Sequence, residues 1–135
     1  MKVVLDTNVL ISALIKGGKP RDLFKKLVKN KQLILSKALI EEFLETIEDP
    51  KIAKYTSEQD VAVFLNTLGK AAEVMNVKSR FRFVKEDPDD DIVVWTAYDG
   101  KADYIVSGDK HLLNLHQYKG TKILTVSQMI LLLNR

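Results

Sequence analysis

The sequence predicts a single α/β domain built on a parallel sheet of four or five strands. Short apolar runs that end abruptly at polar residues recur along the chain, and segments with helical spacing of apolar residues lie between them. Strands that alternate with helices are joined by crossovers, which make neighbouring strands parallel. The 135 residues, of which 46% are hydrophobic, suit one domain with one core.

The most informative apolar run begins the chain. In MKVVLDTNVL the run ends at Asp6, and Thr7 and Asn8 lead directly into a second apolar segment. We expect a buried strand that delivers Asp6 to its carboxyl end, followed by a helix over Val9–Ile15 that a Gly-Gly pair ends. Active sites of open α/β sheets lie in the crevice outside the carboxyl ends of the strands.

The next two helices are predicted from their apolar faces. Pro20 is expected to begin the first of them, because a first turn does not need the missing N–H. A strand over Gln32–Leu35 follows, and Ser36 suits the cap of the next helix. The apolar stripe of that helix consists of Leu39, Ile40, Phe43, Leu44 and Ile47. Glu41 and Glu42 flank this stripe on opposite sides, so helix geometry alone does not choose between them as a site acid.

The central part of the chain is expected to form a helical hairpin. An Asp-Pro pair interrupts the chain at residues 49–50, and Ser57 begins another helix with a capping-box-like pattern. Apolar residues continue at helical spacing from Val61 to Met75. We expect the segment from Glu42 to Asn76 to project from the sheet as a pair of helices, with a short strand over Phe81–Val84 after it.

The last third of the chain returns to the sheet. The predicted elements are a helix over Asp91–Tyr98, a strand over Asp103–Val106, a short helix over His111–Leu115, a strand over Lys122–Leu124 and a helix over Val126–Leu133 capped by Thr125 or Ser127. The strand over Asp103–Val106 is followed by Ser107-Gly108-Asp109. Because the carboxyl ends of parallel strands meet at one edge of a sheet, we expect Asp109 beside Asp6.

Carboxylates therefore gather at one edge of the predicted sheet. They are Asp6, the pair Glu41 and Glu42, the acidic run over residues 87–91, and Asp109. Carboxylates so close repel one another unless a cation neutralises them or they keep their protons. The divalent cations that suit carboxylate and water ligands are Mg²⁺ and Mn²⁺. The sequence thus predicts an acidic site for one or two ions of Mg²⁺ or Mn²⁺.

Composition excludes several other classes of protein. The chain has no cysteine, which excludes disulfides, zinc–thiolate sites and thiol catalysis. No apolar run approaches the ~20 residues that span a bilayer. Asp6 and Asn8 break the first apolar segment, so no signal peptide is expected. We expect a soluble, cytoplasmic protein with no membrane association.

The basic residues are clustered more than the net charge of +3 suggests. One cluster consists of Lys16, Lys19, Arg21, Lys25, Lys26, Lys29 and Lys31, opposed only by Asp22, and a second of Lys78, Arg80, Arg82 and Lys85. A basic surface around an acidic pocket suits a polyanion that is cut at a metal site. The alternative for each cluster is a solvated helix face.

Four motifs together resemble those of PIN domains. They are Val4–Leu10, Ser36 with Glu42 six residues later, Asp91 ahead of Ala97, and Ala102–Asp109. The resemblance covers essentially the whole chain. Within the family, the sequence is similar to the VapC-like toxins of prokaryotic toxin–antitoxin systems. It implies that residues 1–135 form a single PIN-like nuclease domain. The expected fold is a three-layer α/β/α sandwich with a central parallel sheet and a projecting helical hairpin.

The resemblance also implies an activity, which is metal-dependent endonucleolytic hydrolysis of single-stranded RNA. The family's four acids, which bind metal and act in catalysis, match Asp6, Glu42, Asp91 and Asp109. Asn8 matches a polar residue that orients the first acid or the metal-bound water, and Ser107 stands where the family often has Thr. Thr7, Asn8 and Ser107 are expected to support the acids. Lys16, Lys19, Arg21 and Lys25 are expected to bind the RNA.

Two positions keep an alternative. A shift of one residue would exchange Glu42 for Glu41. Asp90 is the alternative to Asp91, which is preferred because it lies eighteen residues before Asp109. For any one of these acids, capping a helix N-terminus is a simpler role than binding metal.

The expected partners are single-stranded RNA, a small antitoxin that covers the active site, and a second copy of the chain. The apolar run from Met129 to Leu133 exceeds one helix face, which favours a homodimer. Trp95 is expected to be a core or dimer-interface residue rather than a platform for a base. His111 and His116 are expected at the surface. The alternative functions are a non-catalytic PIN-like RNA-binding or interaction module and an RNA-processing nuclease without antitoxin.

Overall fold

The computed structural model describes residues 1–78 and 90–135, with the side chain of Asp90 left out. The strands are β1 (Val3–Leu5), β2 (Ile34–Ser36), β3 (Glu73–Met75), β4 (Tyr104–Val106), β5 (Gln117–Tyr118) and β6 (Thr121–Leu124). The helices are α1 (Thr7–Ile15), α2 (Gly18–Lys29), α3 (Lys37–Ile47), α4 (Pro50–Ala53), α5 (Glu58–Ala71), α6 (Asp90–Asp99), α7 (Lys110–Leu113) and α8 (Val126–Leu133). The predicted strand over Phe81–Val84 lies outside the described residues.

The described strands form a four-stranded, mostly parallel sheet and a two-stranded parallel sheet, and a single bridge beside β1 connects the two. On one side β1 pairs with β4 and β4 with β6, both parallel. On the other side a parallel bridge between Val3 and Leu33 joins β1 to β2, and β2 pairs in parallel with β3. The short strand β5 lies antiparallel to β6 at one edge. The predicted α/β class is confirmed: the larger sheet has the order β1-β4-β6-β5, and the bridge places the β2-β3 pair beside β1.

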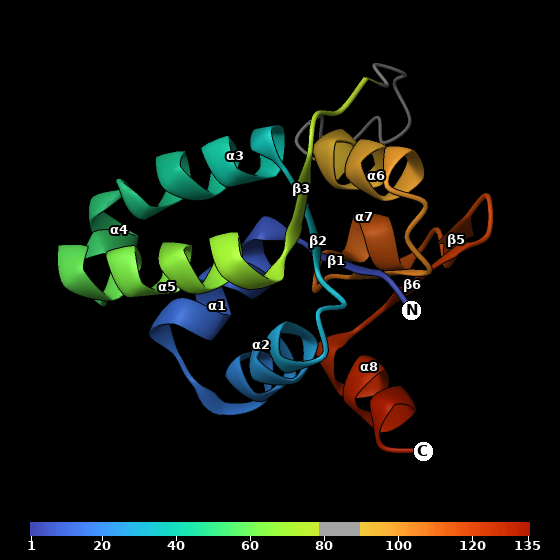
Figure 1. Cartoon of the computed structure of the whole chain (residues 1–135), viewed down its shortest axis with the longest axis horizontal. Coiled ribbons are helices and arrows are strands. Elements are labelled where there is room, and N and C mark those ends of the chain that lie inside the picture. Colours follow the sequence, from blue (N-terminus) through green and yellow to red (C-terminus); the bar gives the residue numbers. More distant parts are fainter. Residues whose placement is uncertain (79–89) are drawn as a thin grey trace.

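Helices cover both faces of this sheet (Figure 1). Val3 and Leu5 point to a core shared with α1, α2, α5 and Met129 of α8. Val4 and Ile105 point to the opposite core, shared with α6 and α7. The alternation of neighbouring residues between two apolar cores follows from the two-residue period of a strand. The result is the three-layer α/β/α arrangement.

Helices α3 and α5 extend away from the sheet and are joined by α4, as the helical hairpin was expected to do (Figure 1). Three stacked phenylalanines hold the hairpin to the domain. The Phe64 ring centroid lies 4.6 Å from that of Phe24 on α2 and 5.5 Å from that of Phe43 on α3. Such stacked pairs add about 0.5–1.5 kcal/mol each to the effect of burial.

Several element boundaries differ from the prediction. Helix α1 begins at Thr7 rather than Val9, and Pro20 is the third residue of α2 rather than its first. Helix α5 ends at Ala71, and the next residues form β3 instead of continuing the helix to Met75. The unpaired edge of β2 explains this change, because its backbone groups gain hydrogen-bond partners from β3. Of the two cap candidates for α8, Thr125 forms a capping box with Gln128.

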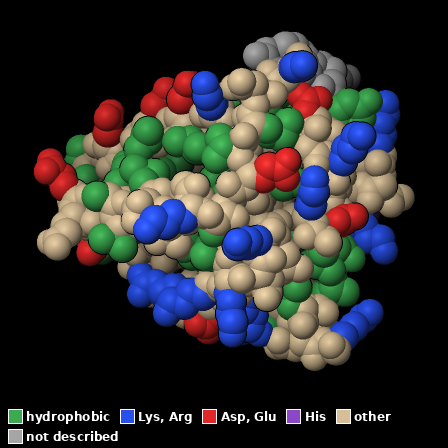
Figure 2. Space-filling view, in the orientation of Figure 1, with side chains coloured by type: hydrophobic (Ala, Val, Ile, Leu, Met, Phe, Trp, Pro, Cys, Tyr) green, Lys and Arg blue, Asp and Glu red, His purple; other side chains and the backbone are tan. Residues whose placement is uncertain are grey.

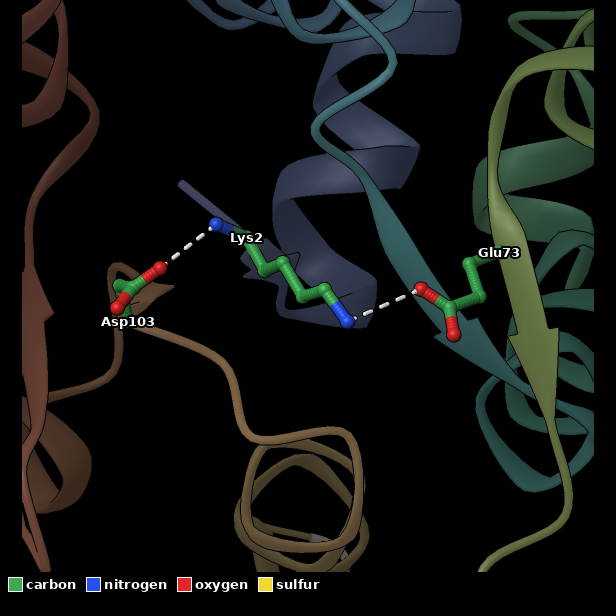
Figure 3. Close-up of polar contacts among 3 residues, drawn as sticks. All are labelled: Lys2, Glu73 and Asp103. Atoms are coloured by element: carbon green, nitrogen blue, oxygen red, sulfur yellow. Dashed lines mark hydrogen bonds and ion pairs between the residues drawn. The ribbon is translucent and has the colours of Figure 1, made fainter.

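Lys2 forms a hydrogen bond and an ion pair at the amino-terminal edge of the sheet (Figure 3). Its backbone N–H donates to Asp103 Oδ2 at 2.8 Å, and its Nζ lies 3.5 Å from Glu73 Oε2. Asp103 precedes β4 and Glu73 begins β3, so one residue ties three strands together. The opposite edge, where the predicted site acids lie, has other hydrogen bonds. None of the described helices has the length and apolar character needed to span a membrane.

Candidate active site

Asp6 and Asp109 lie together at the carboxyl ends of β1 and β4, linked by one hydroxyl. Ser107 Oγ donates to Asp6 Oδ2 at 2.7 Å and accepts from the backbone N–H of Asp109 at 3.0 Å. Because β1 and β4 pair in parallel, with Leu5 opposite Val106, the residues that follow them come to the same edge. Ser107 is completely buried and Asp6 is 4% exposed. The hydroxyl therefore fixes the buried carboxylate of Asp6 and the backbone of the half-buried Asp109.

Burial raises the pKa of the Asp6 carboxyl above its ordinary value. Burial penalises the charged form, and the hydrogen bond from Ser107 opposes this effect. The charge of Asp109 raises the pKa further, while the backbone N–H groups of Thr7 and Asn8 lower it. Desolvation is the largest of these effects, and the net result is a carboxyl that holds its proton more tightly than a solvated aspartate.

Asp109 also has a structural task. Its Oδ1 accepts from the backbone N–H of His111 at 2.7 Å, which makes Asp109 the cap of α7. Asp109 thus both caps α7 and lies near Asp6. The imidazoles of His111 and His116 are both exposed, as expected.

Asp91 and Glu42 approach the same edge from helices. Asp91 lies in the first turn of α6 and is 1% exposed. Since α6 is followed directly by β4, its N-terminus lies at the carboxyl edge of the sheet. On α3, Glu41 is exposed whereas Glu42 is half-buried, with its Oε2 shielded from solvent. This burial favours Glu42 over Glu41 as the site acid, and the assignment stays a prediction.

A buried hydroxyl pair joins the two helices that carry these acids. Ser36 Oγ lies 2.8 Å from Thr96 Oγ1, and both side chains are completely buried. Thr96 donates to the carbonyl of Ile92 at 2.7 Å, so its single hydroxyl proton is used there and Ser36 is the donor between the two. Ser36 also accepts from the backbone N–H of Leu39 as the cap of α3. The sequence analysis missed Thr96, although a polar residue within the apolar stretch of α6 was a visible sign.

The described side chains fit a hard divalent cation. Among the described residues, which leave out Asp89 and the side chain of Asp90, no group of three or more acidic or histidine side chains lies close enough together to hold a metal ion. The four predicted acids are therefore not brought together as one cluster. Asp6 and Asp109 nevertheless lie close enough for the charge of Asp109 to raise the pKa of Asp6, so two carboxylates are available as oxygen donors. Thr7 is 2% exposed, and its Oγ1 has no hydrogen-bond partner among the described residues. Oxygen donors of this kind suit Mg²⁺ or Mn²⁺.

The four predicted RNA contacts lie along or beside α2, where Lys and Arg side chains gather in the lower part of Figure 2. Lys16 and Lys25 are exposed. Lys19 Nζ lies 3.4 Å from Ser127 Oγ. Arg21 is half-buried and donates to the carbonyls of Ala13 and Leu14 at 2.9 and 2.8 Å, so it caps the end of α1.

Comparisons with known proteins bear on the family and the fold of the chain. A protein-family model, the PIN domain, matches residues 2–111. An uncharacterized protein from Methanocaldococcus jannaschii is 35% identical over 121 residues, which are 85% of this chain and 75% of that protein. A chain in the crystal structure of VapBC2 from Rickettsia felis, bound to a DNA fragment from their promoter, has a TM-score of 0.64 and 14% identity. That match covers 93% of this chain and 98% of the other, and it shows a shared fold.

Proposed function

The chain belongs to the PIN-domain family, and from this premise we propose that it is a metal-dependent endoribonuclease that hydrolyses phosphodiester bonds of single-stranded RNA. The observation that carries the proposal is the buried link between Asp6 and Asp109 through Ser107. Holding a buried carboxylate near a second acid costs stability, and a structural role alone does not require it.

Each residue of the site has a task in this proposal. Asp6 and Asp109 hold Mg²⁺ or Mn²⁺, and Glu42 and Asp91 complete the set of ligands for one or two ions. Such an ion, when bound, lowers the pKa of water and neutralises charge on the phosphate. Ser107 keeps the two aspartates at a fixed separation.

Thr7 and Asn8 stand directly after Asp6 at the start of α1. The buried Thr7 hydroxyl is available to hold a water molecule at the site. Asn8 is exposed, and its amide can orient a water or a phosphate oxygen.

We further propose that the enzyme is the toxin of a toxin–antitoxin pair. The fold shared with a chain of the VapBC2 complex supports a small protein partner that covers the acidic edge. We propose that the enzyme acts in the cytoplasm, where its RNA substrate would be found. A homodimer is supported by Leu131 on α8, which is 71% exposed and could pack against a second copy. Lys16, Lys19 and Lys25 would bind the RNA backbone, whereas Arg21 is engaged by α1.

A cleavage assay tests the enzymatic proposal. Labelled single-stranded RNA is incubated with the wild-type protein in Mg²⁺, in Mn²⁺ and in EDTA, and with Asp6→Asn. Asp103→Asn is the matched control, because Asp103 is an aspartate at the opposite edge of the sheet. We expect cleavage that needs the metal, disappears in Asp6→Asn and persists in Asp103→Asn. If wild type and Asp6→Asn are equally inert and calorimetry finds no metal binding, a non-catalytic RNA-binding or interaction module replaces this proposal.

Two pairs of neighbouring acids test the assignment of the other ligands. Glu42→Gln should abolish most cleavage, whereas Glu41→Gln on the exposed side of α3 should leave it within about two-fold, a change too small to reflect a lost charge-assisted contact. Asp91→Asn and Asp90→Asn form the second pair. Equal effects within either pair would refute the assignment at that position.

The toxin proposal has its own test. Expression of the wild-type chain should arrest growth of a host cell, and expression of Asp6→Asn should not. Co-expression of the small protein encoded beside this chain should restore growth and the two should co-purify. An active nuclease that leaves growth unchanged would instead be an RNA-processing enzyme without antitoxin.

A further inference from the structure

A pocket of about 300 Å³ adjoins the acidic site on the side of β6. It lies where α1, α2 and α8 meet the carboxyl ends of β4 and β6. Its polar lining consists of Asn8, Ser12, Ser107, Thr125 and Ser127, and no carboxylate is among its lining residues. A volume of this size lies at the lower end of the range for small-molecule sites. It is sufficient for one nucleotide rather than for a segment of protein.

The pocket and the acids share a wall. Ser107 lines the pocket and donates to Asp6, and Asn8 lines it two residues after Asp6. An RNA strand cut at the acids has to continue away from them on both sides. The neighbouring carboxylates repel its phosphates, so the carboxylate-free pocket is the favourable direction for the chain to follow.

A positive charge stands at this pocket. Lys19 Nζ lies 3.4 Å from the hydroxyl of Ser127, one of the lining residues, and Lys19 precedes Pro20, which is another. A hydroxyl partner leaves the charge of the ammonium group uncompensated. Arg21, two residues later, is instead held by the carbonyls of α1. Of the four predicted RNA contacts, Lys19 is thus the residue whose side chain contacts a pocket residue in the described part of the chain.

We propose that this pocket binds the nucleotide adjacent to the cleaved phosphodiester, with Lys19 Nζ and Ser127 Oγ holding its other phosphate. The proposal rests on the ribonuclease function proposed above and assigns the path of the substrate. An arginine or lysine side chain of a protein partner fits this pocket less well, because Lys19 repels it. Neutral hydroxyl and amide groups in the lining can accept hydrogen bonds from a ribose or a base.

A matched pair of lysines tests the assignment. Lys26 is on the same helix as Lys19, and its Nζ contacts Asn134 Oδ1 at 2.6 Å. Both lysines therefore connect α2 to α8, but of the two only Lys19 contacts a residue of the pocket. RNA binding is measured by fluorescence anisotropy in the Asp6→Asn background, where the oligonucleotide is not cut. Loss of one phosphate contact to a single strand lowers the salt slope by about 0.7, which corresponds to about four-fold weaker binding at ~0.15 M salt. We expect this result for Lys19→Ala and no change for Lys26→Ala.

A second variant tests the pocket itself. Ser127 is exposed near the start of α8, so Ser127→Phe can place a ring in the pocket without disturbing the core. We expect Ser127→Phe to weaken RNA binding at least as much as Lys19→Ala. In wild-type background, Lys19→Ala should raise KM and leave kcat within two-fold.

The outcomes separate the two proposals. If RNA is cleaved but Lys19→Ala and Lys26→Ala weaken binding equally, or if Ser127→Phe binds RNA as the parent does, the pocket assignment is wrong and the nuclease function remains. If Lys19→Ala leaves RNA binding intact and instead weakens binding of a protein partner, the pocket belongs to that partner. If the protein neither cuts nor binds RNA, both proposals are wrong.

Discussion

Removal of the Ser107 hydroxyl should weaken the fold and the site together. Ser107→Ala deletes the hydrogen bond that Asp6 Oδ2 receives and the acceptor that the N–H of Asp109 uses. A hydrogen bond to a charged group contributes about 1.5–3 kcal/mol. The second loss is smaller, because the bond to Asp109 is only partly buried and water can replace it. We expect the free energy of unfolding to fall by about 2–3 kcal/mol, with a fall in Tm of roughly 10 °C.

The same substitution should affect the chemistry. The bond from Ser107 lowers the pKa of Asp6, so its loss should raise that pKa further and move the acid limb of the cleavage profile to higher pH. Groups that support metal ligands in this way change metal affinity or activity by about 10- to 100-fold. The assays are urea unfolding in EDTA, cleavage of labelled RNA at saturating Mn²⁺, and NMR titration of the Asp6 carboxyl.

Ser57→Ala is the control for this experiment. Ser57 Oγ accepts from the backbone N–H of Asp60 as the cap of α5, far from the acids along the helical hairpin. Its loss should cost about 1 kcal/mol of stability and leave cleavage unchanged. The reasoning about Ser107 is refuted if Ser107→Ala reduces activity no more than Ser57→Ala does, or if the Asp6 titration is the same in wild type and variant.

Three further predictions concern stability. In EDTA, the pKa of Asp6 is raised in the folded protein, so the stability gained from its protonated form is present at acid pH and is lost as pH rises through the folded pKa. Asp6→Asn should therefore be more stable than the wild type at pH 7, as measured by urea unfolding. A difference that does not shrink towards pH 4 would contradict this. Gly100→Ala should lower the free energy of unfolding by about 1–3 kcal/mol, because the added Cβ would lie 2.9 Å from the carbonyl oxygen of Thr96. Gly69→Ala should raise the free energy of unfolding by about 0.5–1 kcal/mol, because its added Cβ meets nothing within 4 Å. Thr125→Ala should lower the free energy of unfolding by about 1 kcal/mol through loss of the α8 capping box, and an unchanged Tm would show that the cap is dispensable.

The strands that carry the site could be predicted because their signals are local. In β1 and β4 an apolar run stops at a polar residue, and the parallel pairing needed to bring Asp6 and Asp109 together follows from the intervening helices. Helix caps are equally local, and Ser36, Ser57 and Thr125 all act as the sequence indicates. These features depend on neighbours within four residues, so distant contacts do not overrule them.

The two edge strands could not be predicted because they depend on partners distant in sequence. Residues 73–75 continue the helical spacing of α5, but pairing with β2 and the contact of Glu73 with Lys2 select the extended conformation. Strand β5 has only two residues, and its turn to β6 puts Lys119 and Gly120 at φ values of 44° and 89°. Gly120 alone could have indicated such a turn, and lysine at positive φ is not a recognisable pattern.

Among the predicted site residues, burial in the structure distinguishes side chains that residue type alone does not. The two glutamates on α3 have the same chemistry and flank the same stripe, and only the packing of that helix shows that Glu42 is the more buried of the two. Arg21 was grouped with three lysines by charge, but its planar guanidinium reaches two carbonyls at the end of α1 at once. A lysine at that position could not make both contacts in the same way.

Aspartate side chains have opposite environments at the two edges of the sheet. At the amino-terminal edge Asp103 is exposed and accepts from the backbone of Lys2, whose own ammonium group lies beside Glu73. At the carboxyl edge Asp6 is buried against a second acid, and its hydrogen bonds do not compensate for the lost solvation. Because this destabilises the ionised form, a cation that binds between Asp6 and Asp109 should stabilise the folded protein by mass action. We therefore predict that the unfavourable electrostatics of these two carboxylates favour the binding of a divalent ion.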